Sequence, residues 1–267
     1  MRLVFLGTGT SYGVPQIGCS CRTCTSADPR DKRSRTAALI ESGGRRLLID
    51  TPPELRLQLV AAGVTALDGV LFTHAHADHV HGIDDLRAFS VRQRGRLPVY
   101  GAAATLAELG RRFGYIFDAA PAQPGTSKPE LSAHPLDPDA ETEIAGLRVR
   151  ALALPHGDRT VLGYRVGPVA YLTDAKEIPD TARAQLAGLE VLVLNALLPR
   201  PHPLHLSIPE AVAAALQIGA RRTFLTHLTH ATSHAELAAQ LPRGVAPAYD
   251  GLVIDVGAES GMPTTGW

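Results

Sequence analysis

The sequence predicts a layered protein of the α/β class, with its functional site at one edge of the sheets. Short β-rich runs alternate with helical patterns along all 267 residues. Many of the β-rich runs end at a histidine or an aspartate, residue types that can bind metals or transfer protons. No linker of low complexity divides the chain, so we expect one domain over residues 1–267.

The predicted strands share a polar residue at or directly after the carboxyl end. They cover residues 2–6, 36–41, 45–49, 70–74, 147–156, 169–174 and 221–227. The polar residues at these ends include Asp50, His74, His156, Asp174 and His227. Strand ends at one edge of a layered α/β protein lie close together, so we expect these side chains to converge.

Helical patterns separate the strands, beginning at residue 53, near 102, and at 180, 208 and 233. Ser207 and Ser233 are each followed three residues later by a glutamate, which is the pattern of a capping box at a helix start. The segment 114–140 is rich in Pro, Ala and Gly, so we expect a loop over one face and treat it as a candidate lid.

Composition excludes several classes of protein. The 26 basic and 26 acidic side chains give a formal net charge of zero, which does not indicate a binder of nucleic-acid polymers or of membrane surfaces. The first apolar run is short and leads into Gly and polar residues, as in a first strand and unlike an export signal. No run approaches the roughly 18 apolar residues of a membrane span. We therefore expect a cytoplasmic protein.

The densest functional signal is THAHADHVHG, which follows an apolar strand. His74, His76, Asp78 and His79 fall within six residues of it. In an extended chain, residues i and i+2 point to the same side, so His74 and His76 are placed to bind one metal. Asp78 and His79 lie in the turn into the next helix, within reach of a second metal. With His156, Asp174 and His227, the seven side chains suit two metals that share a carboxylate and a hydroxide.

This pattern resembles the metallo-β-lactamase superfamily of two-metal hydrolases over nearly the whole chain. The resemblance rests on HxHxDH after a strand, followed by PHG, LTD and LTH. It implies an αββα sandwich, with His74, His76 and His156 on one metal and Asp78, His79 and His227 on the other. Asp174 would bridge the two metals, whose shared hydroxide would attack the substrate. The resemblance also implies that Asp50 orients a ligand histidine by a hydrogen bond.

All three cysteines lie in GCSCRTC, residues 18–24. The spacing of Cys19, Cys21 and Cys24 suits a thiolate site around one soft ion, and a structural zinc of the Cys3His type needs one histidine more. His230 in THLTH is the candidate, because it follows His227 on a short turn. An odd cluster of cysteines also favours a reducing compartment. Three unliganded thiols remain the alternative.

The early CxCxxC loop and the THxxH end together resemble one branch of the superfamily, the phosphoribosyl 1,2-cyclic phosphate phosphodiesterases of phosphonate breakdown. The resemblance implies a small phosphodiester as substrate, for example that cyclic phosphate or a cyclic nucleotide. It also implies that the zinc holds the N-terminal loop to the strand that carries His227.

A phosphodiesterase needs a proton donor for the leaving oxygen, and His205 is our candidate. It lies in HLS before the helix predicted at 208, where related phosphodiesterases carry a histidine that acts near the leaving group. Asp78 and Asp174 complete the predicted catalytic set. His202 has the pattern of a solvated loop histidine, and Arg200 is one arginine among many. The sequence does not say whether either contacts the substrate.

The same residues distinguish the proposed phosphodiesterase from three alternative functions. A tRNA-maturing nuclease needs a long basic arm, and this chain has three lysines. Proteins of quinone-cofactor biosynthesis share the CxCxxC loop but often lack part of the ligand set, which is complete here. A metal-dependent binding module without catalysis is the third alternative. The sequence does not decide whether the active-site metals are zinc or manganese. It does not give the oligomeric state either, and a homodimer is one alternative.

Overall fold

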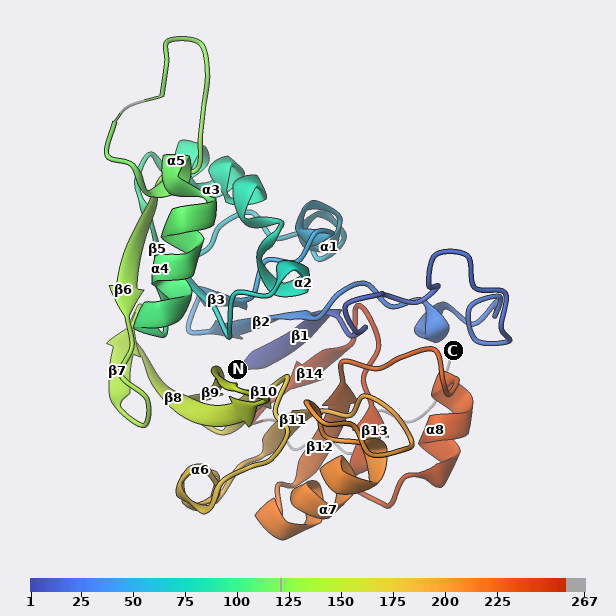
Figure 1. The fold of residues 1–267 in the computed structure, drawn as a ribbon. Helices are drawn as coiled ribbons and strands as arrows, with labels where there is room; N and C mark the ends of the chain where they lie inside the picture. Colours follow the sequence, from blue (N-terminus) through green and yellow to red (C-terminus); the bar gives the residue numbers. More distant parts are fainter. Residues whose placement is uncertain (121, 258–267) are drawn as a thin grey trace.

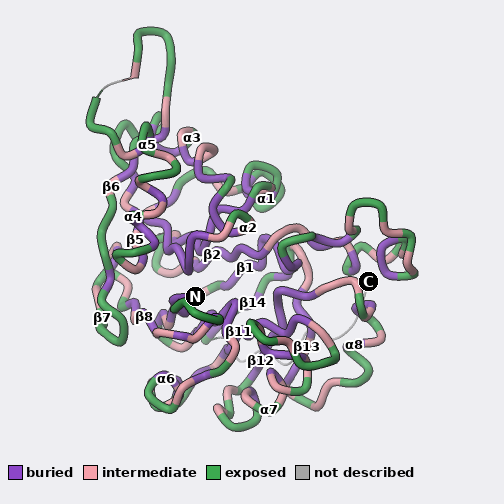
Figure 2. The backbone as a smooth tube through the Cα atoms, viewed as in Figure 1, coloured by how far each residue is buried: buried purple, intermediate pink, exposed green. Residues whose placement is uncertain are grey.

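Two seven-stranded sheets pack face to face in the computed structural model, which describes residues 1–120 and 122–257. Helices cover the outer face of each sheet, so the layers run helix, sheet, sheet, helix (Figure 1). This is the αββα sandwich that the sequence predicts. The purple, buried stretches in Figure 2 follow the strands through the middle of these layers.

The first sheet has the strand order β14-β1-β2-β3-β4-β5-β6. Strands β14, β1, β2 and β3 pair antiparallel, and β3 to β6 pair parallel. Its strands are β1 (Arg2–Gly7), β2 (Ala37–Ser42), β3 (Arg45–Ile49), β4 (Gly69–Leu71), β5 (Leu97–Gly101), β6 (Leu131–Pro135) and β14 (Val253–Asp255). The carboxyl ends of β3 and β4 therefore lie side by side.

The second sheet has the order β13-β12-β11-β10-β9-β8-β7. Strands β7 to β10 pair antiparallel, and β10 to β13 pair parallel. Its strands are β7 (Glu141–Ile144), β8 (Leu147–His156), β9 (Arg159–Val166), β10 (Val169–Leu172), β11 (Val191–Asn195), β12 (Arg222–Thr226) and β13 (Val245–Pro247). Parallel β10 and β12 thus deliver the residues that follow them to one edge.

Within residues 1–120 and 122–257, five α-helices lie on the first sheet and three on the second, as Figure 1 shows for their arrangement. The first five are α1 (Leu55–Ala61), α2 (Ala77–Val80), α3 (Arg87–Gln93), α4 (Ala103–Arg112) and α5 (Gly114–Phe117). The other three are α6 (Asp180–Ala184), α7 (Ile208–Ile218) and α8 (His234–Gln240). Short 3-10 helices cover Pro29–Asp31 and Ile83–Leu86. Both predicted capping boxes are present, at the starts of α7 and α8.

Successive side chains of each strand point to opposite faces of its sheet, and this produces three apolar layers. In β1, Leu3 and Phe5 point into the core between the sheets, while Val4 and Leu6 point to the helices of the first sheet. In β10, Tyr171 lies in the same central core, and Leu172 packs toward the helices of the second sheet. Both faces of each sheet are buried, which is why these strands are apolar almost throughout.

The prediction of one continuous loop over residues 114–140 is wrong, whereas its role as a lid stays a prediction. This segment contains α5, joins the first sheet as β6 and reaches the start of β7. The loop between α5 and β6 projects beyond α3 and α5 (Figure 1), and Arg87 donates a hydrogen bond to its Ser127 carbonyl. Within the described parts of the chain, no helix is long and apolar enough to cross a membrane.

Candidate metal centre

The turn after β4 places four predicted ligands around one point. His74 and His76 lie in the extended stretch after the strand, and Asp78 and His79 lie in the first turn of α2. The backbone of Gly82 anchors this turn by donating a hydrogen bond to the Thr51 carbonyl at 2.8 Å. A Cβ atom at Gly82 would meet the Pro52 carbonyl at 2.1 Å, so only glycine allows this approach.

Residues at or after the carboxyl ends of β4, β8 and β10 form a first group of ligands. One ligand atom each from His74, His76, His156 and Asp174 lies within 4.8 Å of the others. His156 ends β8, and the two-residue turn after it begins with Gly157 at a φ of 63°. The structure therefore brings together four residues that are separated by up to 100 positions in the sequence.

A second group contains His79, Asp174 and His227, again within 4.8 Å of one another. Asp174 belongs to both groups, and its Oδ2 atom lies 3.4 Å from His74 Nε2 and 3.3 Å from His79 Nε2. Asp78 lies beside the second group, with its Oδ2 atom 3.5 Å from His79 Nε2. The carboxylate of Asp174 is thus placed between the two sets of ligands, as a bridging ligand requires.

Hydrogen bonds fix the orientation of three of the histidines. Nδ1 of His79 donates to Asp50 Oδ2 at 2.7 Å, and Nδ1 of His156 donates to the Leu204 carbonyl at 3.0 Å. Thr73 Oγ1 donates to Asp50 and lies 3.0 Å from Nδ1 of His74. A proton on Nδ1 leaves Nε2 as the free lone pair in each ring. The predicted role of Asp50 matches this geometry.

The chemistry of these donors fits a pair of divalent cations. The Nε2 atoms of His74 and His79 are buried, and no hydrogen-bond partner within residues 1–120 and 122–257 satisfies them. A buried nitrogen without a partner costs free energy unless another ligand satisfies it. Imidazole nitrogens and carboxylate oxygens suit zinc, manganese and iron. His74, His76, Asp78, His79, His156, Asp174 and His227 would hold the two ions.

The electrostatics of these side chains follow from burial and from Asp174. Burial holds the pKa of His74 well below its ordinary value, and the neighbouring His79 adds to this effect. Burial also acts against the charged form of His79, but Asp174 and Asp50 outweigh it and raise its pKa well above the ordinary value. Burial opposes ionisation of Asp174, and His227 and His79 reverse this, so its pKa lies well below normal. Metal binding must displace the proton of His79.

Three residues of the centre adopt left-handed backbone conformations. Asp50, Asp174 and His227 have φ angles of 62°, 58° and 57°, and each lies one or two residues after the end of a strand. Residues other than glycine rarely adopt positive φ, and such positions cluster at functional sites. The sharp turn of the backbone directs each side chain toward the centre instead of along the sheet.

The three cysteines surround His230. Each Sγ atom, from Cys19, Cys21 and Cys24, lies 3.3 Å from Nδ1 of His230. A tetrahedral zinc with ordinary bond lengths separates its sulfur and nitrogen ligands by about 3.6 Å, so this spacing suits a Cys3His zinc site. Hydrogen bonding, first from the Cys24 backbone, lowers the pKa of Cys21 to about 6, while burial raises that of Cys24 to about 11.

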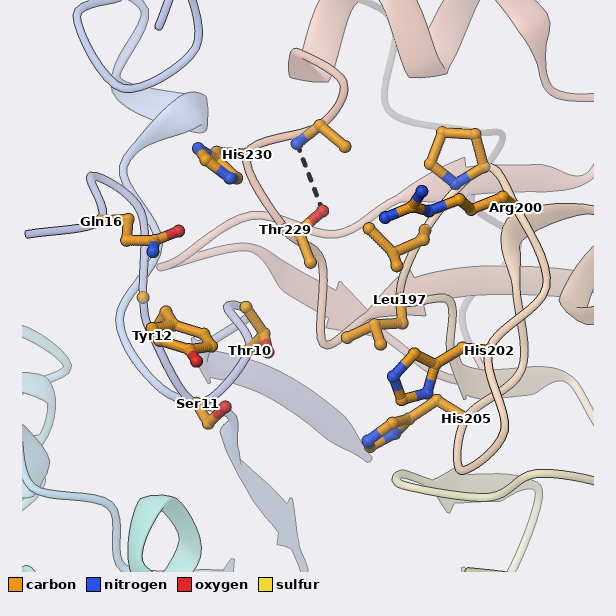
Figure 3. A pocket seen from close by; sticks show the side chains of 14 residues that line it. Thr10, Ser11, Tyr12, Gln16, Leu197, Arg200, His202, His205, Thr229 and His230 are labelled. Atoms are coloured by element: carbon orange, nitrogen blue, oxygen red, sulfur yellow. Dashed lines mark hydrogen bonds between the residues drawn. The ribbon is translucent and has the colours of Figure 1, made fainter. Parts of the chain in front are cut away.

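A cavity of about 710 Å³ adjoins the centre (Figure 3). The loop 10–16 and the turn 229–231 form one side, and the loop 197–205 forms the other. His205 lines this cavity, and its ring stacks on that of His227 with centroids 5.1 Å apart. Burial lowers the pKa of His205 to about 3, against the opposing charge of Asp174. His202 and Arg200 line the same side.

The sequence did not predict several residues of the site. Thr73 and the carbonyl of Leu204 orient ligand histidines, and Tyr12 lines the cavity. A carbonyl has no side-chain signature, so a partner 48 residues away from His156 cannot be found from spacing. Thr73 was detectable, because it sits directly between the strand and His74.

Comparisons with known proteins agree with the fold. The model of the Beta-lactamase superfamily domain matches residues 45–228. The chain is 42% identical over 255 residues to an octanoyltransferase from Porphyromonas gingivalis, covering 94% of this chain and 51% of that protein. It spans about half the length of the first curated relatives that it matches.

Solved structures give the same result. The crystal structure of a diphosphatase from the PhnP family superposes with a TM-score of 0.88 at 37% identity, covering 95% of this chain and 97% of that one. Zinc-bound PqqB from Methylobacterium extorquens shares the fold, with a TM-score of 0.79 at 20% identity over 96% of this chain and all of the other, so zinc is held on this fold. The chain therefore belongs to the metallo-β-lactamase superfamily of hydrolases and resembles its PhnP-like branch.

Proposed function

We propose that the protein is a metal-dependent phosphodiesterase that hydrolyses a small, cyclic phosphodiester. The observation that carries the proposal is the position of Asp174 between two groups of ligand atoms, with His205 stacked beside the second group. A phosphodiester needs charge neutralisation, a nucleophile in line with the leaving group, and a donor for that group. The arrangement of side chains offers a place for each.

The chain holds the reacting groups in fixed geometry. When bound, two divalent cations supply the Lewis acidity and the lowered pKa of water on which such hydrolysis depends. Asp174 is held by the hydroxyl of Thr173, which donates to its Oδ1 atom at 2.8 Å. Asp50 and Thr73 hold His79 and His74, so the ligands need no reorganisation when substrate arrives.

His205 is the proposed donor to the leaving oxygen. Its ring lies against both His156 and His227, with centroids at 4.8 Å and 5.1 Å. Its Nδ1 atom is buried, and no group in the described residues accepts from it or donates to it. At a pKa of about 3 the ring is neutral at pH 7, and in this form it can donate a hydrogen bond to the leaving oxygen through its one N–H. Proton transfer to that oxygen needs the imidazolium form, which the negative charge of a bound phosphodiester would stabilise.

Charge supports a small anion as substrate. Arg200 lines the cavity, and no carboxylate in residues 1–120 and 122–257 forms an ion pair with it. The sequence between α5 and β6, residues 118–130, contains a single cationic residue, Lys128. One lysine does not provide the basic surface that a polynucleotide needs. The proposed partner is therefore a small molecule, with no nucleic-acid polymer and no membrane.

The alternatives are weaker on the same observations. Proteins of quinone-cofactor biosynthesis often lack part of the ligand set, whereas all seven side chains converge here. A binding module without catalysis does not explain why His205 lies beside the centre. About half of the octanoyltransferase relative lies outside the matched region, so the activity of that whole protein supplies no substrate for this chain.

The test is a turnover screen of cyclic and linear phosphodiesters, with bis(p-nitrophenyl) phosphate included and metal content measured on the same preparation. We expect hydrolysis in preparations that hold two ions in the active site and one zinc at the cysteines. A preparation with both active-site ions bound and no turnover of any phosphodiester would reject the enzyme in favour of the binding module.

A further inference from the structure

A second cavity lies near the start of β8, whereas the metal centre lies at the other end of this strand. Its volume of about 520 Å³ lies within the roughly 300–1,000 Å³ typical of sites for small ligands. Arg148 and Arg150 of β8 line it together with Arg165 of β9. Arg150 precedes His156 by six residues, or roughly 20 Å along the strand. This cavity, which we call the arginine cavity, is therefore separate from the metal centre.

The pairing of β8 with β9 brings the three arginines to one face of the second sheet. Val149 and Ala151 belong to the core between the sheets, so Arg148 and Arg150 point to the outer face. Arg165 lies directly opposite Arg150 in the antiparallel pairing, so it points to the same face. Like charges that lie directly opposite each other destabilise a pair of strands. The two opposed arginines therefore need a group that offsets their repulsion.

Gln185, at the carboxyl end of α6, holds both of the opposed guanidinium groups. Arg150 donates from Nη1 to the side-chain oxygen of Gln185 at 2.9 Å, and Arg165 donates from Nη1 to its backbone carbonyl. Arg165 also donates from Nε to the Gly167 carbonyl at 3.0 Å. A guanidinium group has five N–H donors, so three donors of Arg165 stay without an acceptor among the described residues. These donors are held in place before a ligand arrives, which reduces the entropy that binding costs.

Within residues 1–120 and 122–257, a carboxylate pairs with only one of the three arginines. Glu141 lines the same cavity, and its Oε2 atom lies 3.3 Å from Arg150 Nη2. No carboxylate of the described chain forms an ion pair with Arg148 or Arg165, although Glu143 lies opposite Arg148 in the pairing of β7 with β8. The lining therefore carries three positive charges and one negative charge, a net charge of +2. Guanidinium groups bind phosphate in a bidentate manner, which makes an oxyanion of phosphorus the matching ligand.

We infer that the arginine cavity binds a small anion with two phosphate groups. One group lies between Arg150 and Arg165, where its charge offsets the repulsion of the opposed pair. The other group reaches Arg148, which lies two residues from Arg150, or roughly 7 Å, along β8. A single phosphate reaches the opposed pair and leaves Arg148 unpaired. The site does not depend on the proposed hydrolysis, because it shares no residue with the metal centre.

The experiment titrates the metal-loaded protein with methylenediphosphonate in a calorimeter at fixed ionic strength. We expect one molecule to bind per chain in the arginine cavity, in addition to any molecule at the metal centre. Arg148→Gln together with Arg165→Gln should weaken this binding by at least about tenfold. Arg92→Gln together with Arg221→Gln is the matched control, because it removes two charges from exposed arginines outside the cavity. Binding at the metal centre and chelation of its ions are common to all three proteins, so the difference measures the arginine cavity.

The same stoichiometry and affinity in the wild type and the arginine variant would overturn the inference. An equal loss in the matched control would also overturn it, because the effect would then come from net charge alone. If Arg165→Gln prevents folding, Arg148→Gln alone decides, since Arg148 is exposed and its substitution removes no packing contact of the core. This single variant should bind methylenediphosphonate at least about threefold more weakly than the wild type, and an unchanged affinity would reject the site.

Discussion

The carboxylate of Asp50 accepts a hydrogen bond of 2.7 Å from Nδ1 of His79, and both side chains are completely buried. Asp50 follows β3, and His79 lies in α2 after the neighbouring strand β4. Asp50 also accepts hydrogen bonds from the backbone and the hydroxyl of Thr73, each at 2.8 Å. One carboxylate therefore holds the whole turn that carries four predicted metal ligands.

Asp50→Asn should weaken metal binding without unfolding the protein. Asparagine tolerates the left-handed backbone at this position, but its amide cannot hold His79 as a carboxylate does. We expect the affinity for the active-site metals to fall about 10- to 100-fold, measured by competition with a chelator. Asp139→Asn is the matched control, because Asp139 has a φ of 64° and is exposed. Equal affinities in all three proteins would contradict the role of Asp50.

Asp174→Asn should abolish turnover and reduce the metal content. Asp174 is the residue common to both groups of ligand atoms, so its loss affects both ions. Elemental analysis and hydrolysis of bis(p-nitrophenyl) phosphate check the two effects on one preparation, and Asp174→Ala should behave alike. Wild-type turnover in either variant would show that Asp174 does not bridge the metals.

His205→Ala should lower kcat by about 10²- to 10³-fold and leave the metals in place. The side chain lies beside the ligand histidines and is not part of either ligand group. His202→Ala tests the neighbouring histidine of the same loop and should leave kcat near the wild-type value. Loss of metal from His205→Ala would mean that this residue is a ligand and not a proton donor.

Cys21→Ser should remove about one zinc per chain and lower the melting temperature. The four ligand atoms join the loop that carries Cys19, Cys21 and Cys24 to the turn after β12. Loss of this connection should lower the melting temperature by at least about 5 °C, measured by calorimetry. Ser20→Ala, which changes an exposed neighbour, should alter neither value. An unchanged zinc content would exclude the Cys3His site.

Stability should fall between pH 7 and pH 5 because of His234. Burial, assisted by the charge of Arg33, lowers the pKa of this histidine to about 4. The unfolded chain takes up a proton at its ordinary value near 6.5, whereas the folded chain resists until about pH 4. Its contribution is therefore complete above the unfolded pKa and is lost as pH falls, by about 2 kcal/mol at pH 5.

Urea unfolding at pH 7 and pH 5 measures this effect. His234→Gln removes the titrating group, so the difference in free energy of unfolding between the two pH values should be smaller in the variant by about that amount. Each protein is compared with itself, which cancels any stability that the substitution costs at pH 7. The same pH dependence in both proteins would show that His234 does not control this transition.

The sequence predicts the fold well where an apolar strand is followed by a histidine or an aspartate of the candidate metal centre. His74, His156, Asp174 and His227 were identified because each follows an apolar run, and the structure brings all four to one edge. The edge strands β6 and β7 were missed, since each has a single buried residue, Leu131 and Ile144. A strand with one buried side chain has no alternation to detect, so the sequence predicts a loop where β6 forms.

The cavity could not be predicted in the same way. Its walls come from loops near residues 12, 197 and 230. Tyr12 can contact a molecule in the cavity only because its ring is exposed. Exposure results from the way two distant loops approach each other, which local sequence does not encode. His205 was identified from its HLS pattern, whereas its contact with His227 became visible only in the structure.

The positive φ angles of Asp50, Asp174 and His227 have an evolutionary consequence. Each such residue destabilises the folded state by about 1–3 kcal/mol relative to a relaxed backbone. Glycine would relieve this backbone cost at all three positions, but it would also remove the ligands and the hydrogen bonds of Asp50, so we expect these residues to persist under selection for turnover. A lineage that abandoned the reaction should accumulate glycine or asparagine at these three corners before its hydrophobic interior changes.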